Sequence, residues 1–585
     1  MNNIFIEKIK SLYNLILEPI DIMFKLTAIN RYKSDLNIGI NDSFGEYYYK
    51  LVEKSKNSGV VYTPVEISEY IIRSTIKEDD VVKNPFIKIL DPASGCGNII
   101  IPCYRNLKRI YLDNLDTINQ MHNIRLTLEN IDKHIINNNI FGYDIDEISI
   151  KVLLIDLFLE AKTILKDNFI VGDFLFDNSP IVFDVIIGNP PYVGHKSIDR
   201  EYCRRLKENY SNIYKDKGDL SYCFFKRSIE KTTKRGKISF ITSRYFIEAP
   251  SGENLRKLLL ADININSVVD FYGIRPFKDA GIDPIIIFLE KGNNINEIDI
   301  IKPLGSNKEL SENFYNSVFM NQEHAYRCFK LTKQDLKDTW MLIDRVEREI
   351  INKINAKCNS TLGDICDSYQ GIITGCDKAF IVDKEIIENM EIETELLRPW
   401  IKNSNIKQFK VEKNNKFIIY SDFIDEQDKY KKSIEYIEKF KDKLSNRREC
   451  IKGIRKWYQL QWGRNPDLFE KEKIIFPYKA DSNKFAVDKG SYFSADVYCL
   501  LPKSTMNVSN SYLVSILNSK LYEFYFKCYG KKLGGKLYDY YPNTIMKLPI
   551  ALDIQIIDDF NVSIYNYFNL SYEQIEIIEE KLKSN

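Results

Sequence analysis

The chain has 585 residues, of which 28% are charged and 13% aromatic, and its formal net charge is +1. This length predicts two or more domains with full cores. A net charge near zero excludes a uniformly basic protein, so any contact with nucleic acid must come from local basic patches. The eleven cysteines form no C-x-x-C pair and only four histidines are present. This argues against a zinc site, a disulfide framework and histidine acid/base chemistry.

The first part of the chain carries the apolar spacing of an amphipathic helix, and we expect a helical segment over residues 1–57. It shows neither a signal peptide nor an apolar run long enough to span a membrane, which predicts a cytoplasmic protein. A turn follows at residues 59–66. There we expect Thr63 to cap a helix and Pro64 to occupy its first position.

A short buried strand is predicted at residues 87–90, followed by the small-residue loop Asp91-Pro-Ala-Ser-Gly-Cys-Gly-Asn98. A strand, a loop of small residues and a helix let backbone N–H groups approach a nucleotide-like ligand closely. No Gly-Lys-Ser/Thr follows, and the loop is not a complete G-x-G-x-x-G. A Walker loop is therefore excluded, and a dinucleotide site is the weaker option.

Two further strands are expected to end in acidic residues, at Asp144 and at Asp173-Phe174. A carboxylate in the first position can accept hydrogen bonds from ribose hydroxyls. Asp173 can accept from an adenine amino group while Phe174 packs on the ring. A single aspartate at a strand end is more often a cap or turn residue, but a series of three in chain order is hard to obtain by chance.

The apolar run 183–187 predicts a buried strand, which Gly188-Asn-Pro-Pro-Tyr192 must end. Asn189 offers a side-chain carbonyl, and prolines have no N–H to donate, so this loop presents mainly hydrogen-bond acceptors. Two acceptors can hold both hydrogens of a planar amino group and free its lone pair for attack. Tyr192 adds a flat face for an extruded base. The alternative is an ordinary turn, since Asn-Pro is a common turn dipeptide.

The C-terminal half has no acid/base or nucleophile constellation, so binding is its expected work. Basic and aromatic residues gather between residues 441 and 464, and a second basic group surrounds glycines near residue 534. Such patches neutralise phosphates, and arginines and apolar groups read base edges. The alternative is solvated helix faces and core tryptophans. The candidate DNA contacts are Lys441, Arg447, Arg448, Lys452, Arg455, Trp457, Trp462, Arg464, Lys531, Lys532 and Lys536.

Together these motifs resemble the S-adenosylmethionine-dependent N6-adenine DNA methyltransferases of the γ (TaqI-like) order. The resemblance implies an α/β fold with three parts. The helical segment 1–57 precedes a Rossmann-like methyltransferase domain with a mixed, mostly parallel sheet over residues 58–329. An α+β target-recognition domain over residues 330–585 follows.

The same resemblance implies roles for individual residues. Asn189, Pro190 and Tyr192 would act in catalysis, and Phe277 would stack on the other face of the flipped base, with Phe271 as the second choice. S-adenosylmethionine is the implied cofactor. The residues implied to bind it are Tyr62, Thr63, Pro64, Asp91, Ala93, Gly95, Gly97, Asp144, Ile145, Asp173, Phe174 and Asn189.

Strings in the C-terminal half, at residues 370–380, 446–450, 453–458 and 538–543, closely resemble an orphan member of this family from clostridia. This implies double-stranded DNA as the partner, with an A-rich, non-palindromic site of the CAAAAA kind whose last adenine is methylated. One copy of the chain suffices for such a site, so a monomer without a nuclease domain, a metal or a membrane contact is expected.

Other functions remain open from the sequence. The chain could be the methylase component of a restriction-modification system with a different site, or a methylase fused to a nuclease, for which 57 leading residues are too few. It could also methylate RNA or a protein amide. A DNA-binding regulator with a vestigial cofactor fold is the alternative from outside the enzymes.

Overall fold

The computed structural model describes residues 2–53, 62–163, 167–194, 197–215, 218–277, 281–292, 296–304, 308–320, 326–337, 340–555 and 559–584. The chain divides into two compact units, residues 1–342 and 343–585. None of the helices in these ranges is long and apolar enough to cross a membrane. Residues 59–61 of the expected turn, and the expected boundary after residue 57, lie outside the described ranges.

Within the described residues, the first unit is built on one nine-stranded sheet in the order β3-β2-β1-β4-β5-β7-β6-β8-β9. Strands β3, β2, β1, β4 and β5 pair in parallel, as do β6 and β8, while β7 and β9 run antiparallel to their neighbours. The predicted mixed, mostly parallel sheet is confirmed. Its strands are β1 (Ile89–Asp91), β2 (Ile140–Asp144), β3 (Phe169–Val171), β4 (Phe183–Gly188), β5 (Thr232–Ser243), β6 (Asn264–Asp270), β7 (Pro284–Glu290), β8 (Glu297–Pro303) and β9 (Tyr326–Thr332).

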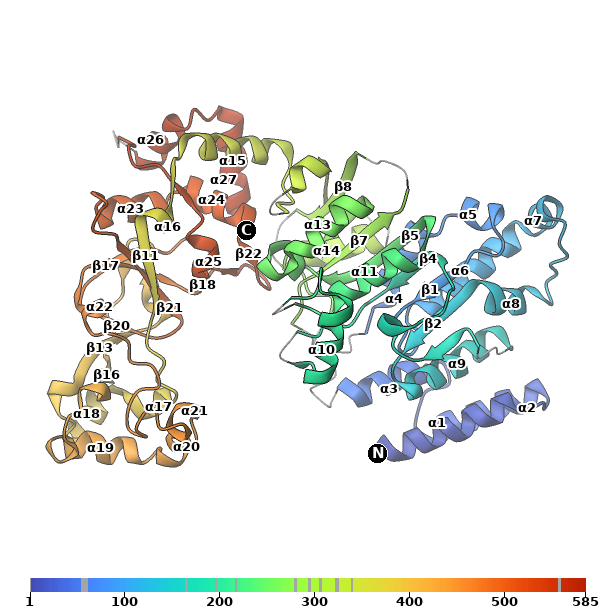
Figure 1. Cartoon of the computed structure of the whole chain (residues 1–585), viewed down its shortest axis with the longest axis horizontal. Coiled ribbons are helices and arrows are strands. Elements are labelled where there is room, and N and C mark those ends of the chain that lie inside the picture. The colour runs from blue at the N-terminus through green and yellow to red at the C-terminus, as the bar shows by residue number, and fades with distance from the viewer. Residues whose placement is uncertain are drawn as a thin grey trace. The chain divides into compact units, whose positions relative to one another are not determined.

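Helices cover both faces of this sheet (Figure 1). Apolar residues alternate between the faces along each strand, so that Val185 and Ile187 enter one core and Ile186 enters the other. The first core contains residues of α4 (Val65–Thr75), α6 (Ile100–Asp113), α9 (Glu147–Ala161) and α14 (Lys308–Phe319). The second contains residues of α10 (Arg200–Asn209), α11 (Ser221–Lys231), α12 (Tyr245–Glu248) and α13 (Glu253–Asp262).

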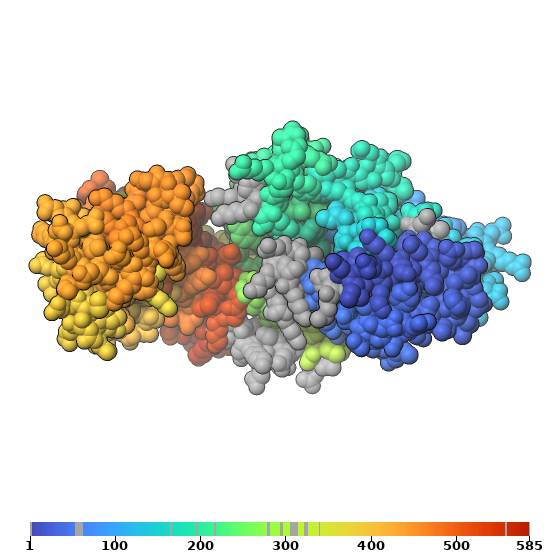
Figure 2. All heavy atoms as spheres, turned by 90° about the horizontal axis from the view of Figure 1, so that it is seen from below, coloured from blue at the N-terminus to red at the C-terminus, as the bar shows by residue number. Residues whose placement is uncertain are grey.

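The N-terminal segment forms three helices, α1 (Asn2–Leu17), α2 (Ile22–Asp35) and α3 (Phe44–Glu53). They pack on the face of α9 that the sheet leaves uncovered, through Val152, Ile155 and Phe158 of α9. Their blue surface forms one side of the first unit in Figure 2. Asp156 of α9 holds the start of α3, because its carboxylate accepts hydrogen bonds from the Phe44 and Gly45 N–H groups at 3.1 and 2.9 Å.

The first unit extends past residue 329, the last residue that the sequence assigned to the methyltransferase domain. Strand β9 pairs along its whole length with β8, from Tyr326 opposite Pro303 to Thr332 opposite Glu297. The sheet therefore retains these residues, and the second unit begins at Ile343. Other helices of the first unit are α5 (Glu78–Lys83), α7 (Leu115–His122) and α8 (Ile131–His134).

The second unit combines small sheets with helices, as the predicted α+β domain requires. One sheet has the order β11-β21-β17-β19 and another the order β12-β16-β13-β20. The strands of the first are β11 (Cys366–Gln370), β21 (Val497–Pro502), β17 (Lys473–Pro477) and β19 (Ala486–Asp488). Those of the second are β12 (Ile381–Asp383), β16 (Lys416–Ile419), β13 (Leu397–Ile401) and β20 (Tyr492–Phe493). The principal helices are α15 (Arg345–Lys357), α18 (Lys384–Met390), α19 (Lys431–Glu438), α20 (Lys441–Ser445), α21 (Arg448–Ile451), α23 (Asn510–Leu517), α24 (Lys520–Tyr529), α26 (Phe560–Tyr567) and α27 (Tyr572–Ser584).

Candidate active site

A cavity of about 440 Å³ lies at the carboxyl ends of β1, β2, β3 and β4. Ligands bind at this edge in open α/β sheets, and the volume suits a nucleotide-sized molecule. The predicted site residues that line the cavity are Thr63, Asp91, Ala93, Gly95, Asp144, Ile145, Asp173, Phe174, Asn189, Pro190 and Tyr192.

The loop after β1 is shaped by two glycines in the left-handed region, Gly95 at φ 51° and Gly97 at φ 91°. This backbone is accessible to glycine at little cost. It turns the Gly95 N–H toward the Asp144 carboxylate at 2.8 Å. Asp91 begins the loop, is buried, and accepts a hydrogen bond from the Ala93 N–H at 3.1 Å. Burial raises the pKa of Asp91 to about 8, and the nearby Asp144 carboxylate adds to the shift.

Replacing Asp91 by Asn should flatten the pH dependence of stability of the ligand-free protein. Because the pKa is raised in the folded state, the folded protein keeps this proton between about pH 4 and pH 8 while the unfolded chain loses it. The stability that Asp91 contributes is therefore complete below about pH 4 and is lost as the pH rises through about 8.

Thermal melting from pH 5 to pH 8.5 measures this effect. The wild type should lose more of its melting temperature over the range than Asp91→Asn does. Burial also raises the pKa of Asp156, to about 7, but that residue is present in both proteins and shifts both curves alike. Identical slopes for the two proteins would contradict the prediction.

Three further carboxylates border the cavity and are fixed by hydrogen bonds. Asp144 also accepts from the Asp146 N–H at 2.8 Å. Asp146 accepts from the hydroxyls of Tyr48 at 2.9 Å and Ser149 at 2.7 Å. Asp173 accepts from the Leu175 N–H at 3.0 Å and the Tyr202 hydroxyl at 2.9 Å. Asp146 and Asp173 are thus helix caps and cavity residues at once, and the three carboxylates give the cavity an acidic side suited to a cationic ligand.

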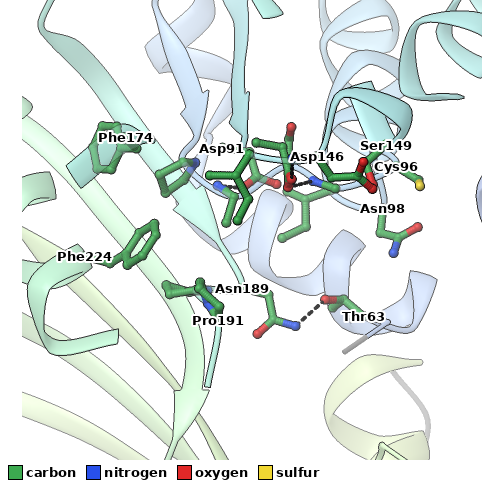
Figure 3. Close-up of a pocket in the computed structure, with 18 of the residues that line it drawn as sticks. Thr63, Asp91, Cys96, Asn98, Asp146, Ser149, Phe174, Asn189, Pro191 and Phe224 are labelled. Atoms are coloured by element: carbon green, nitrogen blue, oxygen red, sulfur yellow. Dashed lines mark hydrogen bonds between the residues drawn. The ribbon is translucent and has the colours of Figure 1, made fainter. Parts of the chain in front are cut away.

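One end of the cavity is apolar and aromatic. Phe174 and Phe224 lie there together in Figure 3, with ring centroids 6.0 Å apart and planes within 28° of parallel. Ile145 also lines the cavity and is 79% exposed, although it is a large aliphatic residue. Flat and aliphatic surfaces beside carboxylates are what a purine base with its amino group requires.

The Asn189 amide is held between two hydroxyl groups. Its Nδ2 donates to Thr63 Oγ1 at 3.0 Å, as Figure 3 shows, and its Oδ1 accepts from the Tyr192 hydroxyl. The Tyr192 hydroxyl also lies 3.2 Å from the Ile241 carbonyl oxygen. Asn189 is therefore fixed at the strand end with its carbonyl oxygen facing Tyr192.

The prediction that Thr63 caps the next helix and that Pro64 is its first residue is wrong. Helix α4 begins at Val65, with Pro64 at the N-cap position and no side-chain cap. Pro64 has an extended ψ of 144°, which delays the helix by one residue. The buried Thr63 hydroxyl accepts from Asn189 instead.

Several implied site residues do not line the cavity. Tyr62 packs its ring 5.3 Å from that of Tyr49. Gly97 belongs to the loop after β1, and a Cβ added to it would meet the Leu153 side chain at 3.0 Å. Phe277 and Phe271 are both buried in the first core. The structure does not bring either phenylalanine to the cavity beside Tyr192.

The sequence did not indicate the contribution of helix α3 or of three scattered residues. Gly45, Tyr48, Tyr49 and Val52 line the cavity from α3. The only signal was the run of tyrosines at 47–49, which has no specific meaning alone. Asp146, Tyr202 and Phe224 also line the cavity. Among the described residues, no group of three or more His, Cys, Asp or Glu side chains is placed to hold a metal ion.

The DNA-contact candidates divide by exposure. Arg447 and Lys532 are buried, whereas Arg455 is half-buried and paired with Asp422 at 3.0 Å. Trp457 and Lys531 are half-buried as well. Arg464 is exposed, and its Nε donates to the Gly371 carbonyl at 3.0 Å. The other exposed candidates are Lys441, Arg448, Lys452, Trp462 and Lys536.

Comparison with known proteins agrees with this architecture. Residues 138–277 match the Eco57I restriction-modification methylase family, and residues 398–550 match the TaqI-like C-terminal specificity domain. The chain is 26% identical to the type II methyltransferase M.BanIII of Aneurinibacillus aneurinilyticus, over 80% of this chain and 85% of that one. It is 22% identical to M.BstVI of Geobacillus stearothermophilus, over 90% and 98% of the two chains.

Among solved structures, the type IIL restriction-modification enzyme MmeI in complex with DNA shares the fold. Its TM-score is 0.58 at 14% identity, over 92% of this chain and 73% of that one. Fold and cavity together define a methylase domain followed by a specificity domain. The chain is thus similar to the type II, TaqI-like methyltransferases of restriction-modification systems in both its methylase region and its specificity region.

Proposed function

We propose that the protein transfers a methyl group from S-adenosylmethionine to the N6 amino group of an adenine in double-stranded DNA. The observation that carries this proposal is the Asn189 amide, fixed by Thr63 and Tyr192 at the end of an acidic and aromatic cavity. This arrangement supplies a hydrogen-bond acceptor for a planar amino group beside a nucleoside-sized space.

The residues of the cavity fit S-adenosylmethionine. Phe174, Phe224 and Ile145 would enclose its adenine, and Asp173 would accept from the adenine amino group. Asp144 and Asp146 would lie near the ribose hydroxyls, with the loop from Asp91 to Gly97 around the methionine part. The carboxylates suit a ligand with a sulfonium and an ammonium group, because opposite charges attract strongly in a partly buried site.

S-adenosylmethionine supplies an already activated methyl group, so the protein needs to position the nucleophile rather than provide a strong base. Asn189 and the Pro190 carbonyl would accept from the two hydrogens of N6, which directs the nitrogen lone pair out of the ring plane. Tyr192 would stack on the flipped base and offset part of the cost of extrusion. A second stacking face from Phe277 would require this side chain to leave its core position.

Tyr192 has two separable parts in this proposal. Its hydroxyl now donates to the oxygen of Asn189 that the base would use, so the base must displace it. Tyr192→Ala should lower the single-turnover rate about 10- to 100-fold, because stacking is worth roughly 1–3 kcal/mol. Tyr192→Phe keeps the ring and removes the competing donor, so its rate should stay within about threefold of wild type. Equal losses in the two variants would show that the hydroxyl, rather than the ring, assists the reaction.

The second unit would bind the duplex through its exposed basic residues. In its C-terminal strings the chain is similar to the clostridial orphan methyltransferase CamA. We therefore propose a CAAAAA-like site with the last adenine as the target, recognised by a single copy of the chain. Stiff A-tract shape would contribute to the selection of such a site.

Methyl transfer from labelled S-adenosylmethionine tests the proposal. One duplex carries CAAAAA, and the second replaces the last adenine by 2-aminopurine, which has no amino group at C6. Label on N6 of the first duplex alone supports both the reaction and its target. Label on a random-sequence duplex but not on CAAAAA would keep the reaction and reject the site. No label on any DNA, with the cofactor bound, would overturn the proposal.

A further inference from the structure

A short loop in the second unit presents two isoleucines to solvent. Helix α21 ends at Ile451, which is 73% exposed, and Ile454 three residues later is 58% exposed. Isolated exposed apolar residues are common on protein surfaces. Two large aliphatic side chains within four residues, in a loop otherwise rich in cations, are a more specific feature.

The loop is held firmly. Gly453 takes the left-handed conformation at φ 69°, and its N–H donates to the Cys450 carbonyl at 2.9 Å. The N–H groups of Ile454 and Arg455 both donate to the Glu449 carbonyl, at 2.9 and 3.2 Å. These bonds close the end of α21 and fix the backbone that carries both isoleucines, so their exposure is built into the structure.

Buried Arg447 ties this loop to the body of the unit. Its guanidinium donates to the carbonyl oxygens of Thr374 at 3.1 Å and of Trp457 and Gln459 at 2.8 Å each. Thr374 belongs to the turn after β11, and the other two residues follow the loop. The isoleucines are thus presented from a rigid base, which a surface used for recognition requires.

Exposed cations flank the pair in the sequence. Arg448, Lys452 and Lys456 are exposed, and Lys441 in the preceding helix is exposed over the Trp457 ring. Helices α20 and α21 are neighbours at one end of the second unit in Figure 1, and the orange surface around them faces the viewer in Figure 2. Exposed apolar groups in a cation-rich segment match a polyanion that also offers apolar groups, and duplex DNA is such a partner.

We propose that Ile451 and Ile454 form an apolar reading tip that contacts thymine methyl groups of the bound duplex. The reason is chemical. The C5 methyl of thymine is the apolar group that base pairs present at their groove edges, whereas the cations around the tip can contact only phosphates or base acceptors. The inference rests on the proposed function, because it takes double-stranded DNA as the substrate.

The experiment compares CAAAAA duplexes whose opposite strand contains either thymine or uracil. Uracil pairs with adenine in the same way but has no C5 methyl. Binding is measured by fluorescence anisotropy for the wild type, for Ile451→Ala/Ile454→Ala, and for Ile40→Ala. Ile40 is 70% exposed in the first unit and serves as the matched control. All the changed side chains are exposed, and melting temperatures verify that each variant is folded.

Wild type and Ile40→Ala should bind the uracil duplex about tenfold more weakly than the thymine duplex, as expected for the loss of one or two buried methyl contacts. The double variant should bind the thymine duplex about tenfold more weakly than wild type and show no further loss with uracil. The proposed methyl contact would be overturned if the wild type bound the two duplexes equally well. It would also be overturned if the double variant showed the same loss of affinity with uracil as the wild type.

Methylation of the same thymine duplex separates this result from the proposed function. Weaker binding of the uracil duplex without methyl transfer would support the methyl contact and reject the proposed reaction. Methyl transfer without any effect of uracil would support the reaction and reject the methyl contact. A rise in 2-aminopurine fluorescence beside the contact, without a uracil effect, would mean that the isoleucines wedge between base steps and would also overturn methyl reading.

Discussion

Asn189→Ala is expected to lower the rate of methyl transfer about 10³-fold while the affinities for S-adenosylmethionine and DNA change little. A preorganised hydrogen-bonding group at a reacting centre is worth about 10²–10³ in rate. In this protein Thr63 holds the amide before any base arrives, and the Tyr192 hydroxyl occupies its oxygen until the base displaces it. The variant loses both the acceptor for N6 and the group that holds the two hydroxyls in place.

Single-turnover methyl transfer and separate binding measurements check this expectation. Asn98→Ala is the matched control, because Asn98 also lines the cavity but lies on the loop after β1. Asn98→Ala should raise the KM for S-adenosylmethionine more than it lowers kcat. A near-normal rate in Asn189→Ala would show that the amide is not the acceptor. Parallel losses of rate and DNA affinity would place its role in binding.

The edge of the sheet that carries the cavity was predictable because its signals are local. The end of each strand and its aspartate or asparagine can be recognised from a few neighbouring residues. Parallel strands then bring their carboxyl ends together at one edge of the sheet. Asp91, Asp144, Asp173 and Asn189 were all assigned to this edge, and all line the cavity. The roles proposed for them in cofactor and base binding are tested by the experiments above.

Contacts between distant segments could not be predicted in the same way. Helix α3 reaches the cavity because Asp156, more than a hundred residues later, accepts from its first N–H groups. Tyr202 reaches Asp173 from α10. The hydrophobic pattern of residues 1–57 predicts a helical segment but not which surface covers it. That surface is the outer face of α9, a helix whose mostly apolar sequence shows only that it is buried on both sides.

Two adjacent arginines in the basic run of the second unit also show that the sequence does not predict long-range contacts. Charge pattern alone treats Arg447 and Arg448 alike. In the structure Arg448 is exposed, whereas Arg447 is buried and donates to backbone carbonyls. Which arginine turns inward depends on the acceptors that the rest of the fold supplies. A composition argument can therefore locate a basic surface without naming its contacts.

Arg447→Met is accordingly expected to destabilise the second unit by about 3–5 kcal/mol, because it breaks a buried hydrogen-bond network. Methionine fills much of the volume but leaves the carbonyl oxygens of Leu444, Thr374, Trp457 and Gln459 without this donor. Each buried acceptor without a partner costs about 1–3 kcal/mol. Denaturant unfolding of the full chain measures the change.

Arg448→Met is the control from the next position. Being exposed, it should change the unfolding free energy by no more than about 0.5 kcal/mol. If Arg448 contacts a phosphate, its loss should reduce the slope of log affinity for DNA against log salt concentration by about 1. A normal unfolding curve for Arg447→Met, together with a reduced salt slope, would assign Arg447 to the DNA. Loss of stability in Arg447→Met, with a salt effect only in Arg448→Met, would give the two neighbours the separate roles that their hydrogen bonds indicate.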